Sequence, residues 1–129
     1  MATYFYAKTL DLPLDQAEAL VREKLQEEGF GVLTEIDVKA TLKKKLDVDF
    51  RPYKILGACN PQFAYQALQA EDKIGTMLPC NVVVQDAGDG QTEVVAIDPI
   101  ASMQAVENAQ LHPVAQEVRE RLRKVIDRL

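Results

Sequence analysis

The feature that most constrains the fold is a pair of apolar segments joined by a glycine-rich tetrapeptide. Residues 81–86 (NVVVQD) and 92–97 (TEVVAI) are rich in β-branched side chains and flank Ala87-Gly88-Asp89-Gly90. β-Branched residues favour strands, and glycines supply the positive φ angles that tight hairpin turns need. The sequence therefore predicts an antiparallel hairpin in this part of the chain.

Three further segments have strand character. Residues 3–8 (TYFYAK) are aromatic and β-favouring, and they stop before Asp11 and Pro13. Residues 31–38 alternate, which predicts a strand with one wet face. One side of the predicted strand holds Val32, Thr34, Ile36 and Val38. The other side holds Leu33, Glu35 and Asp37. Residues 53–59 (YKILGAC) are typical of a buried strand.

Helical spacing of apolar residues marks two longer segments. Residues 13–28 form an amphipathic pattern that Gly29 should end, and residues 113–129 repeat apolar side chains on one stripe. Shorter helices are expected at residues 39–46, from residue 61 through residue 68, and at residues 100–106. Asn60-Pro61 and Asp98-Pro99 each combine a good N-cap with a residue preferred at the first helical position.

The order of these elements favours an α+β fold. A mixture of strands and helices without regular alternation suits a two-layer sandwich, with a mainly antiparallel sheet and helices packed on one face. The chain has 129 residues, of which 47% are hydrophobic and 27% charged. That length and composition predict a single domain over residues 1–129 that folds without metal or disulfide staples.

Charge and composition exclude several classes of protein. A net charge of -5 argues against a nucleic-acid binder with a basic surface. No apolar run approaches the roughly 20 residues that span a bilayer, so we expect a cytoplasmic protein with no membrane partner. Two cysteines and one histidine, without a C-x-x-C pair, predict neither a disulfide framework nor a metal site. Both cysteines should be thiols.

One local segment runs against the overall charge. Residues 39–54 contain six basic and two acidic side chains, a net of +4. A small anionic ligand or partner could dock there. A solvated helix face explains the lysines as well, and we favour it because no aromatic ladder accompanies the charges. Exposed charges of this kind should bind anions weakly and in a salt-sensitive way.

The usual catalytic motifs are absent from the sequence. It contains no G-x-G-x-x-G, P-loop, G-x-S-x-G or H-E-x-x-H, and its single histidine, His112, is best read as a helix-start residue. Cys59 precedes a predicted helix, where backbone N–H groups and the helix dipole can lower the pKa of a thiol. The plainer interpretation, which we favour, is that Cys59 is a small buried side chain and Asn60 an ordinary cap.

A set of short motifs carries a family resemblance. In chain order they are Gly29-Phe30, Tyr53-Lys54-Ile55-Leu56, Cys59-Asn60-Pro61, Leu78-Pro79-Cys80 and Asp98-Pro99. Together they resemble the bacterial and archaeal family catalogued as domain of unknown function family 302, over nearly the whole chain. The resemblance implies a compact α+β fold and a dimer. It makes Cys59, Asn60, Pro61, Pro79 and Cys80 part of a shared pattern, and it implies no reaction, substrate or cofactor.

Three functional hypotheses follow. The first is a non-catalytic ligand-binding or dimeric interaction module, with its pocket formed by Cys59, Asn60, Pro61, Pro79 and Cys80. The alternative is a thiol-dependent enzyme or redox sensor that uses Cys59 or Cys80. The third is a pure assembly module, which needs only an apolar patch or a free strand edge. Apolar residues on both sides of the segments 4–6 and 94–97 favour a homodimer, because a second subunit would cover them.

Overall fold

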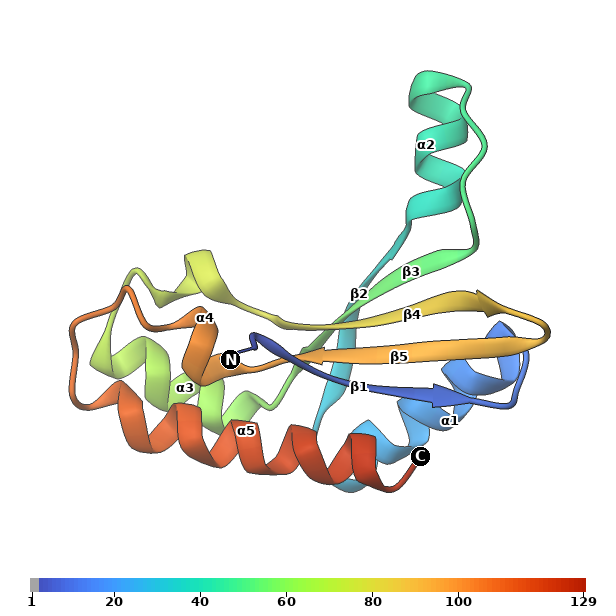
Figure 1. Ribbon diagram of the computed structural model, residues 1–129. Helices are drawn as coiled ribbons and strands as arrows, with labels where there is room; N and C mark the ends of the chain where they lie inside the picture. The colour runs from blue at the N-terminus through green and yellow to red at the C-terminus, as the bar shows by residue number, and fades with distance from the viewer. Residues whose placement is uncertain (1–2) are drawn as a thin grey trace.

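A five-stranded antiparallel sheet forms the centre of the computed structural model, which describes residues 3–129 (Figure 1). The strands are β1 (Phe5–Leu10), β2 (Gly31–Asp37), β3 (Tyr53–Cys59), β4 (Cys80–Gly88) and β5 (Gln91–Ile97). Their order across the sheet is β1-β5-β4-β3-β2, and each neighbouring pair is antiparallel. The strands β1 and β2 are therefore the two edges.

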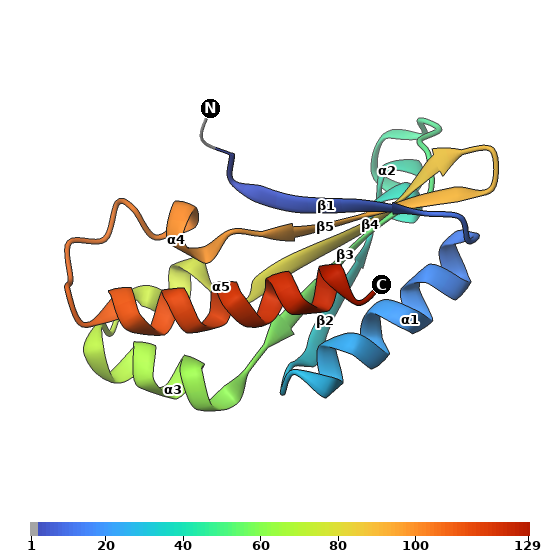
Figure 2. The ribbon, with the colours of Figure 1, turned by 60° about the horizontal axis from the view of Figure 1, so that its bottom comes forward.

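Helices cover one face of this sheet (Figure 2). The helices are α1 (Leu14–Glu27), α2 (Val38–Leu46), α3 (Pro61–Ala70), α4 (Pro99–Ser102) and α5 (Leu111–Asp127), with a short 3₁₀ turn η1 (Ile74–Met77). α1 and α5 pack against the sheet, and α3 lies beside α5 in the same layer. The predicted α+β fold, an antiparallel sheet with helices packed against it, is confirmed.

The hydrophobic core lies between the sheet and the helices α1 and α5. Each strand sends alternate side chains into it, and both helices contribute apolar residues at helical spacing. The largest fully buried side chains of this core are Val21, Leu25, Leu56, Val82, Val84, Val94, Leu122 and Val125. The remaining side chains of each strand point to the other face of the sheet, over which no helix of the described residues 3–129 packs.

The predicted hairpin is present as β4 and β5. Val83 pairs with Val95 in its centre, and the turn has positive φ at Gly88, Asp89 and Gly90. The first strand lies two residues later than the predicted segment 3–8. It begins at Phe5 and runs to Leu10, because Leu10 pairs with Thr92 of β5. Pairing with β5 therefore sets where β1 ends.

The predicted alternation of residues 31–38 is wrong. Val32 pairs with Ala58 and Thr34 pairs with Gly57, so the intervening Leu33 forms a bulge. A bulge adds one residue to one strand, which places Val32 and Thr34 on opposite faces. As a result Leu33 and Ile36 are exposed, at 68% and 48% of their surface.

Two helix boundaries also differ from the prediction. The short helix expected at residues 100–106 ends at Ser102, although Asp98 caps it as predicted, with Oδ1 3.0 Å from the amide nitrogen of Ile100. The last helix begins at Leu111 instead of residue 113. Pro113 is tolerated in the first turn because its missing N–H would have no partner there. His112 is exposed in that turn.

The predicted lysine-rich helix forms as α2, but it stands apart from the body of the protein (Figure 1). We call residues 38–52, which link β2 to β3, the arm. Asp37 caps the helix, accepting a hydrogen bond of 2.9 Å from the amide of Ala40. No residue of α2 is buried. Within residues 3–129, no helix is long and apolar enough to cross a membrane.

Candidate functional site

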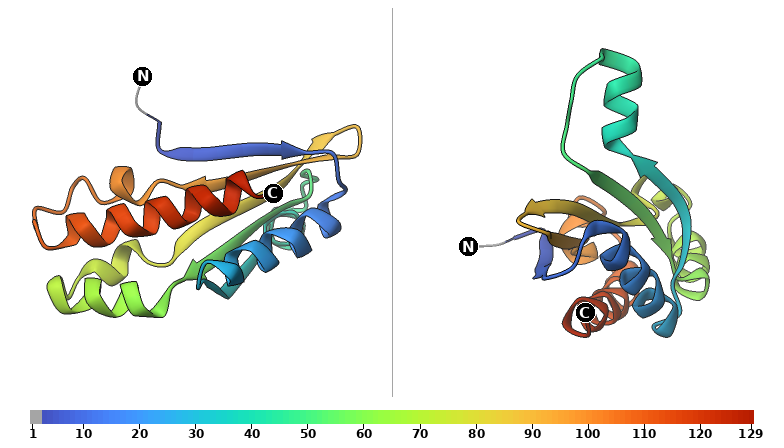
Figure 3. Two further views of the ribbon diagram at one scale, coloured as in Figure 1. Left: turned by 90° about the horizontal axis from the view of Figure 1, so that it is seen from below. Right: turned by 90° about the vertical axis from the view of Figure 1, so that its right-hand side faces the viewer.

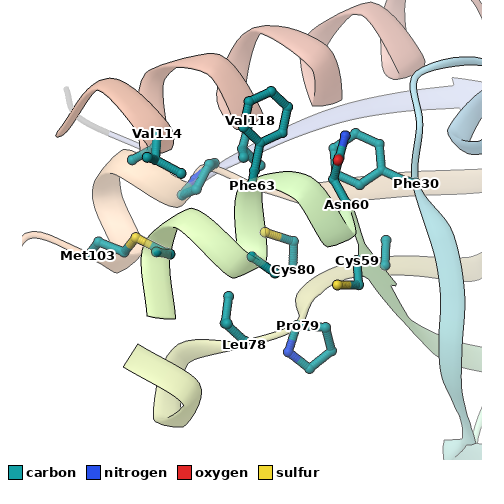
Figure 4. A pocket seen from close by; sticks show the side chains of 15 residues that line it. Phe30, Cys59, Asn60, Phe63, Leu78, Pro79, Cys80, Met103, Val114 and Val118 are labelled. Carbon is teal, nitrogen blue, oxygen red and sulfur yellow. The ribbon is translucent and has the colours of Figure 1, made fainter. Parts of the chain in front are cut away.

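The two cysteines lie at one corner of the sheet. Cys59 ends β3, Cys80 begins β4, and Cys80 pairs in register with Ala58, the neighbour of Cys59. In Figure 4 Cys80 lies beneath Phe63 of α3, and Cys59 lies beside Pro79. Both are free thiols. Two segments that are separate in the sequence are therefore joined here by strand pairing.

An apolar hollow opens at this corner (Figure 4). Cys59, Asn60, Pro79 and Cys80 line it, whereas Pro61 does not and is exposed at the start of α3. The rest of the lining comes from other elements, including Phe30, Phe63, Leu78, Met103, Val114 and Val118. The cavity volume, counted as the space that the centre of a water molecule can occupy, is about 30 Å³. A single water needs roughly half of that volume on the same measure. This hollow fits a small apolar group.

Asn60 occupies the N-cap position of α3, but its side chain does not cap the helix, so that part of the prediction is wrong. Its Nδ2 instead donates a hydrogen bond of 3.3 Å to the main-chain carbonyl of Glu28, just after α1. Arg121 of α5 donates to the same carbonyl at 3.2 Å. The side-chain amide of Asn60 therefore bonds to the end of α1 instead of capping α3, because the last carbonyls of a helix need donors from outside the helix. Asn60 ties α1 to α3 beside the hollow.

The electrostatics of the thiols are opposite to those of an activated nucleophile. Burial raises the pKa of Cys59, and burial together with the neighbouring Cys59 raises the pKa of Cys80 to about 11. The start of α3 does not lower the pKa of Cys59, because apolar side chains surround the thiols and disfavour the thiolate. This agrees with the favoured interpretation of Cys59 as a buried side chain and runs against the thiol-dependent alternative. A reactive cysteine needs the opposite shift.

We therefore expect slow alkylation of both cysteines near neutral pH. Iodoacetamide reacts with the thiolate, so a raised pKa lowers the rate, and Cys80 should react more slowly than Cys59 because it is more deeply buried. Rates measured against pH on the wild type, Cys59→Ser and Cys80→Ser assign each thiol. Rapid labelling of either thiol, with a midpoint below the roughly 8.5 of free cysteine, would contradict this expectation and revive the thiol-dependent alternative.

The second candidate site is the face of the sheet opposite α1 and α5, which we call the open face. Its central row crosses all five strands in register: Ile36, Ile55, Val83, Val95 and Ala7. Phe5 and Ile97 form a pair beside this row. A shallow hollow of about 270 Å³ lies among side chains that include Phe5, Tyr53, Val83 and Val95. The central row makes an apolar strip across the open face, exposed at both ends and half-buried at Ile55, Val83 and Val95.

The comparison with protein families decides where the chain belongs. The model described as "Domain of unknown function DUF302" matches residues 6–129. The chain belongs to this family. Among solved structures, the crystal structure of an uncharacterized conserved DUF302 protein from Bacillus stearothermophilus is similar, with 30% sequence identity and a TM-score of 0.90. The match covers 98% of each chain. None of the curated proteins matches the chain.

Sequence reasoning found only part of these sites in the DUF302 chain. The strand ends and the turn motifs located Cys59, Asn60, Pro79 and Cys80, which the structure brings together. It missed Phe30 and Met103, because nothing local relates the end of α1 or the segment after α4 to this corner. For the open face, the apolar residues on both sides of segments 4–6 and 94–97 pointed to Phe5, Val95 and Ile97. The row across the other strands was missed, although the alternation within β4 was an available signal for Val83.

Proposed function

We propose that this DUF302 chain is a non-catalytic interaction module that forms a homodimer through the open face of its sheet. The carrying observation is the apolar row across all five strands, from Ile36 to Ala7, on a face without a helix over it. An antiparallel sheet with one solvated face normally shows polar side chains there. Contiguous exposed apolar surface of this kind is typical of an interface.

The amount of exposed surface supports the same proposal. The accessible surface is 7760 Å² for a mass of 14.4 kDa, whereas a folded monomer of that mass is expected to expose about 6,800 Å². The excess is close to the roughly 800 Å² that each partner buries in an interface of standard size. A second copy can cover the row because a twofold interface uses the same patch on both subunits.

The test is a charge placed in the middle of the row. Val83→Lys should raise the dissociation constant of the dimer by at least about tenfold, because a desolvated ammonium would face the partner's apolar row. Leu68→Lys is the matched control, since Leu68 is exposed on α3, away from the open face. Sedimentation equilibrium reports the association, and circular dichroism reports the fold. An unchanged dissociation constant in a folded Val83→Lys protein would rule out this interface.

We propose as a second function that the hollow beside Cys59 holds a small apolar molecule or alkyl group. The supporting observation is its lining, which is apolar apart from Asn60 and contains no lysine, arginine or histidine. That composition favours an uncharged ligand over the small anion that the lysines suggested. Those lysines lie on the arm and, for Lys54, at the start of β3, the end of the strand opposite Cys59.

Xenon is a suitable probe, because dry apolar cavities of modest size bind it. Under xenon, amide resonances of Cys59 and Ala67 should shift in a saturable way. Ala64→Leu fills the hollow from α3 and should abolish the shifts, since Ala64 is part of the lining. Shifts that persist in that variant, or none in the wild type, would exclude a ligand of this class at this site.

A further inference from the structure

We infer that the arm of each copy completes the interface of the other. Residues 38–52 of one subunit lie along the β1 edge of the open face of the second copy, where arm lysines meet Glu93. This inference rests on the proposed homodimer and specifies which segment of the second copy makes the contact.

The arm packs little against its own chain. Its last residues contact the body, where Arg51 donates a hydrogen bond of 2.9 Å to Gln85 and the carbonyl of Pro52 accepts one of 2.9 Å from Asp86. Its helix is nine residues long, has no buried residue, and contacts chiefly the two strands that it joins, β2 and β3. Isolated helices shorter than about 12 residues are marginal in water. The arm nevertheless displays apolar side chains, with Leu46 exposed over 65% of its surface and Val48 over 44%. A second copy that covered these side chains would stabilise the arm.

The topology restricts where the arm of a second copy can reach. α2 stands on the side of the sheet away from α1 and α5, beside the open face (Figures 1 and 3). It rises from the β2–β3 side, and β1 is the opposite edge. If the two open faces meet about a twofold axis parallel to the strands, the arm of one copy comes over β1 of the other. An axis across the strands would place it over β2 instead.

Charge selects the first of these arrangements. Side chains alternate along β5, so Glu93 lies with Val95 on the open face, while Val94 is buried under the helices. Its carboxylate accepts a hydrogen bond of 2.9 Å from Gln85, which in turn accepts one of 2.9 Å from Arg51 of the same chain. Glu93 itself has no direct ion-pair partner within residues 3–129. Glu93 pairs in register with Thr9, near the end of β1. A dimer that covered Glu93 without a cation would bury an unpaired charge, which is costly.

The arm supplies the missing cations. It holds five basic and two acidic residues, net +3 in a chain of net -5, so the rest of the chain carries -8. Of its lysines, Lys43 pairs with Asp47 and Asp49, whereas Lys44 and Lys45 form no ion pair in the described part of the chain. Complementary charge of this kind fixes the register of an interface more than it adds affinity. In a symmetric dimer, the lysines of each arm would pair with Glu93 of the other copy.

A charge-exchange series tests this contact. Glu93→Lys and the double variant Lys44→Glu/Lys45→Glu should each raise the dimer dissociation constant about tenfold, and the triple variant should recover most of the loss. The double variant Lys73→Glu/Lys124→Glu makes the same change of net charge at exposed positions off the arm, and should have little effect. Sedimentation equilibrium at low salt measures all four proteins.

The outcomes separate this inference from the proposed function. Recovery in the triple variant supports the contact between the arm and Glu93. If the charge variants leave the dissociation constant unchanged while Val83→Lys raises it, the open face forms the dimer without the arm and this inference is overturned. If the loss of binding free energy in the triple variant equals the sum of the losses in Glu93→Lys and in Lys44→Glu/Lys45→Glu, the two sites do not touch. The inference is then again overturned. A monomeric wild type overturns both proposals.

Discussion

Replacing Leu122 by alanine is expected to lower the free energy of unfolding by about 2–5 kcal/mol. Leu122 is fully buried on α5, within the core that joins this helix to α1 and the sheet. Removing its three outer side-chain carbons loses their transfer free energy and leaves a cavity that the backbone on both sides keeps open. Urea denaturation followed by circular dichroism measures the change.

Leu68→Ala is the matched control for this prediction. The substitution is chemically the same, but Leu68 is 45% exposed on α3, so its loss should cost less than about 1 kcal/mol. Both variants must be compared at one protein concentration, because the proposed dimer would add to the apparent stability. Equal losses for the two variants would show that α5 does not cover the core as described.

Replacing Gly57 by alanine is expected to cost about 1–3 kcal/mol. A Cβ atom at this position would overlap Oγ1 of Thr34 and lie 2.7 Å from Cγ of Pro79. The threonine hydroxyl can rotate away, but the proline ring is fixed to the backbone that leads into β4. The strand would have to move, and with it the corner that holds Cys59 and Cys80. Thermal denaturation should show a clearly lowered midpoint.

Gly31→Ala provides the control, because a Cβ atom there meets nothing within 4 Å. Gly31 lies on β2 and pairs with Cys59, so both substitutions test the same pair of strands. Thr34→Ala should recover part of the loss when combined with Gly57→Ala, since it removes one of the two clashes. If Gly57→Ala were as stable as Gly31→Ala, the close approach of Pro79 to β3 would be refuted.

The sequence predicts an element well where local patterning and cross-strand pairing agree. β3 has its predicted bounds, and the hairpin of β4 and β5 turns at the predicted glycines, because β-branched runs and turn residues act over a few positions. The bulge at Leu33 was not predictable in this way. It depends on which residues of β3 lie opposite, and the periodicity of β2 alone does not contain that register.

At the candidate sites too, the sequence predicted the features that depend on nearby residues and missed those that depend on tertiary packing. The motifs around Cys59 and Cys80 marked the corner, but the sequence left open whether burial or the nearby helix start sets the pKa of Cys59. Burial among residues from distant elements, including Phe63 and Val118, decides it. The isolation of α2 was also invisible in the sequence, where Val38, Leu42 and Leu46 share a helical face that suggests packing. Tertiary placement decides whether such a face is covered, and here Val38 and Leu42 are only half-buried and Leu46 is exposed.

The central claim, a homodimer through the open face, is tested most directly by the mass of the wild-type protein in solution. Sedimentation equilibrium across roughly 1–100 µM spans the affinities of ordinary interfaces. The account predicts a mass that approaches twice 14.4 kDa at the upper concentrations. It also predicts that Val83→Lys shifts this rise to higher concentration. A constant mass of 14.4 kDa over the whole range would contradict it.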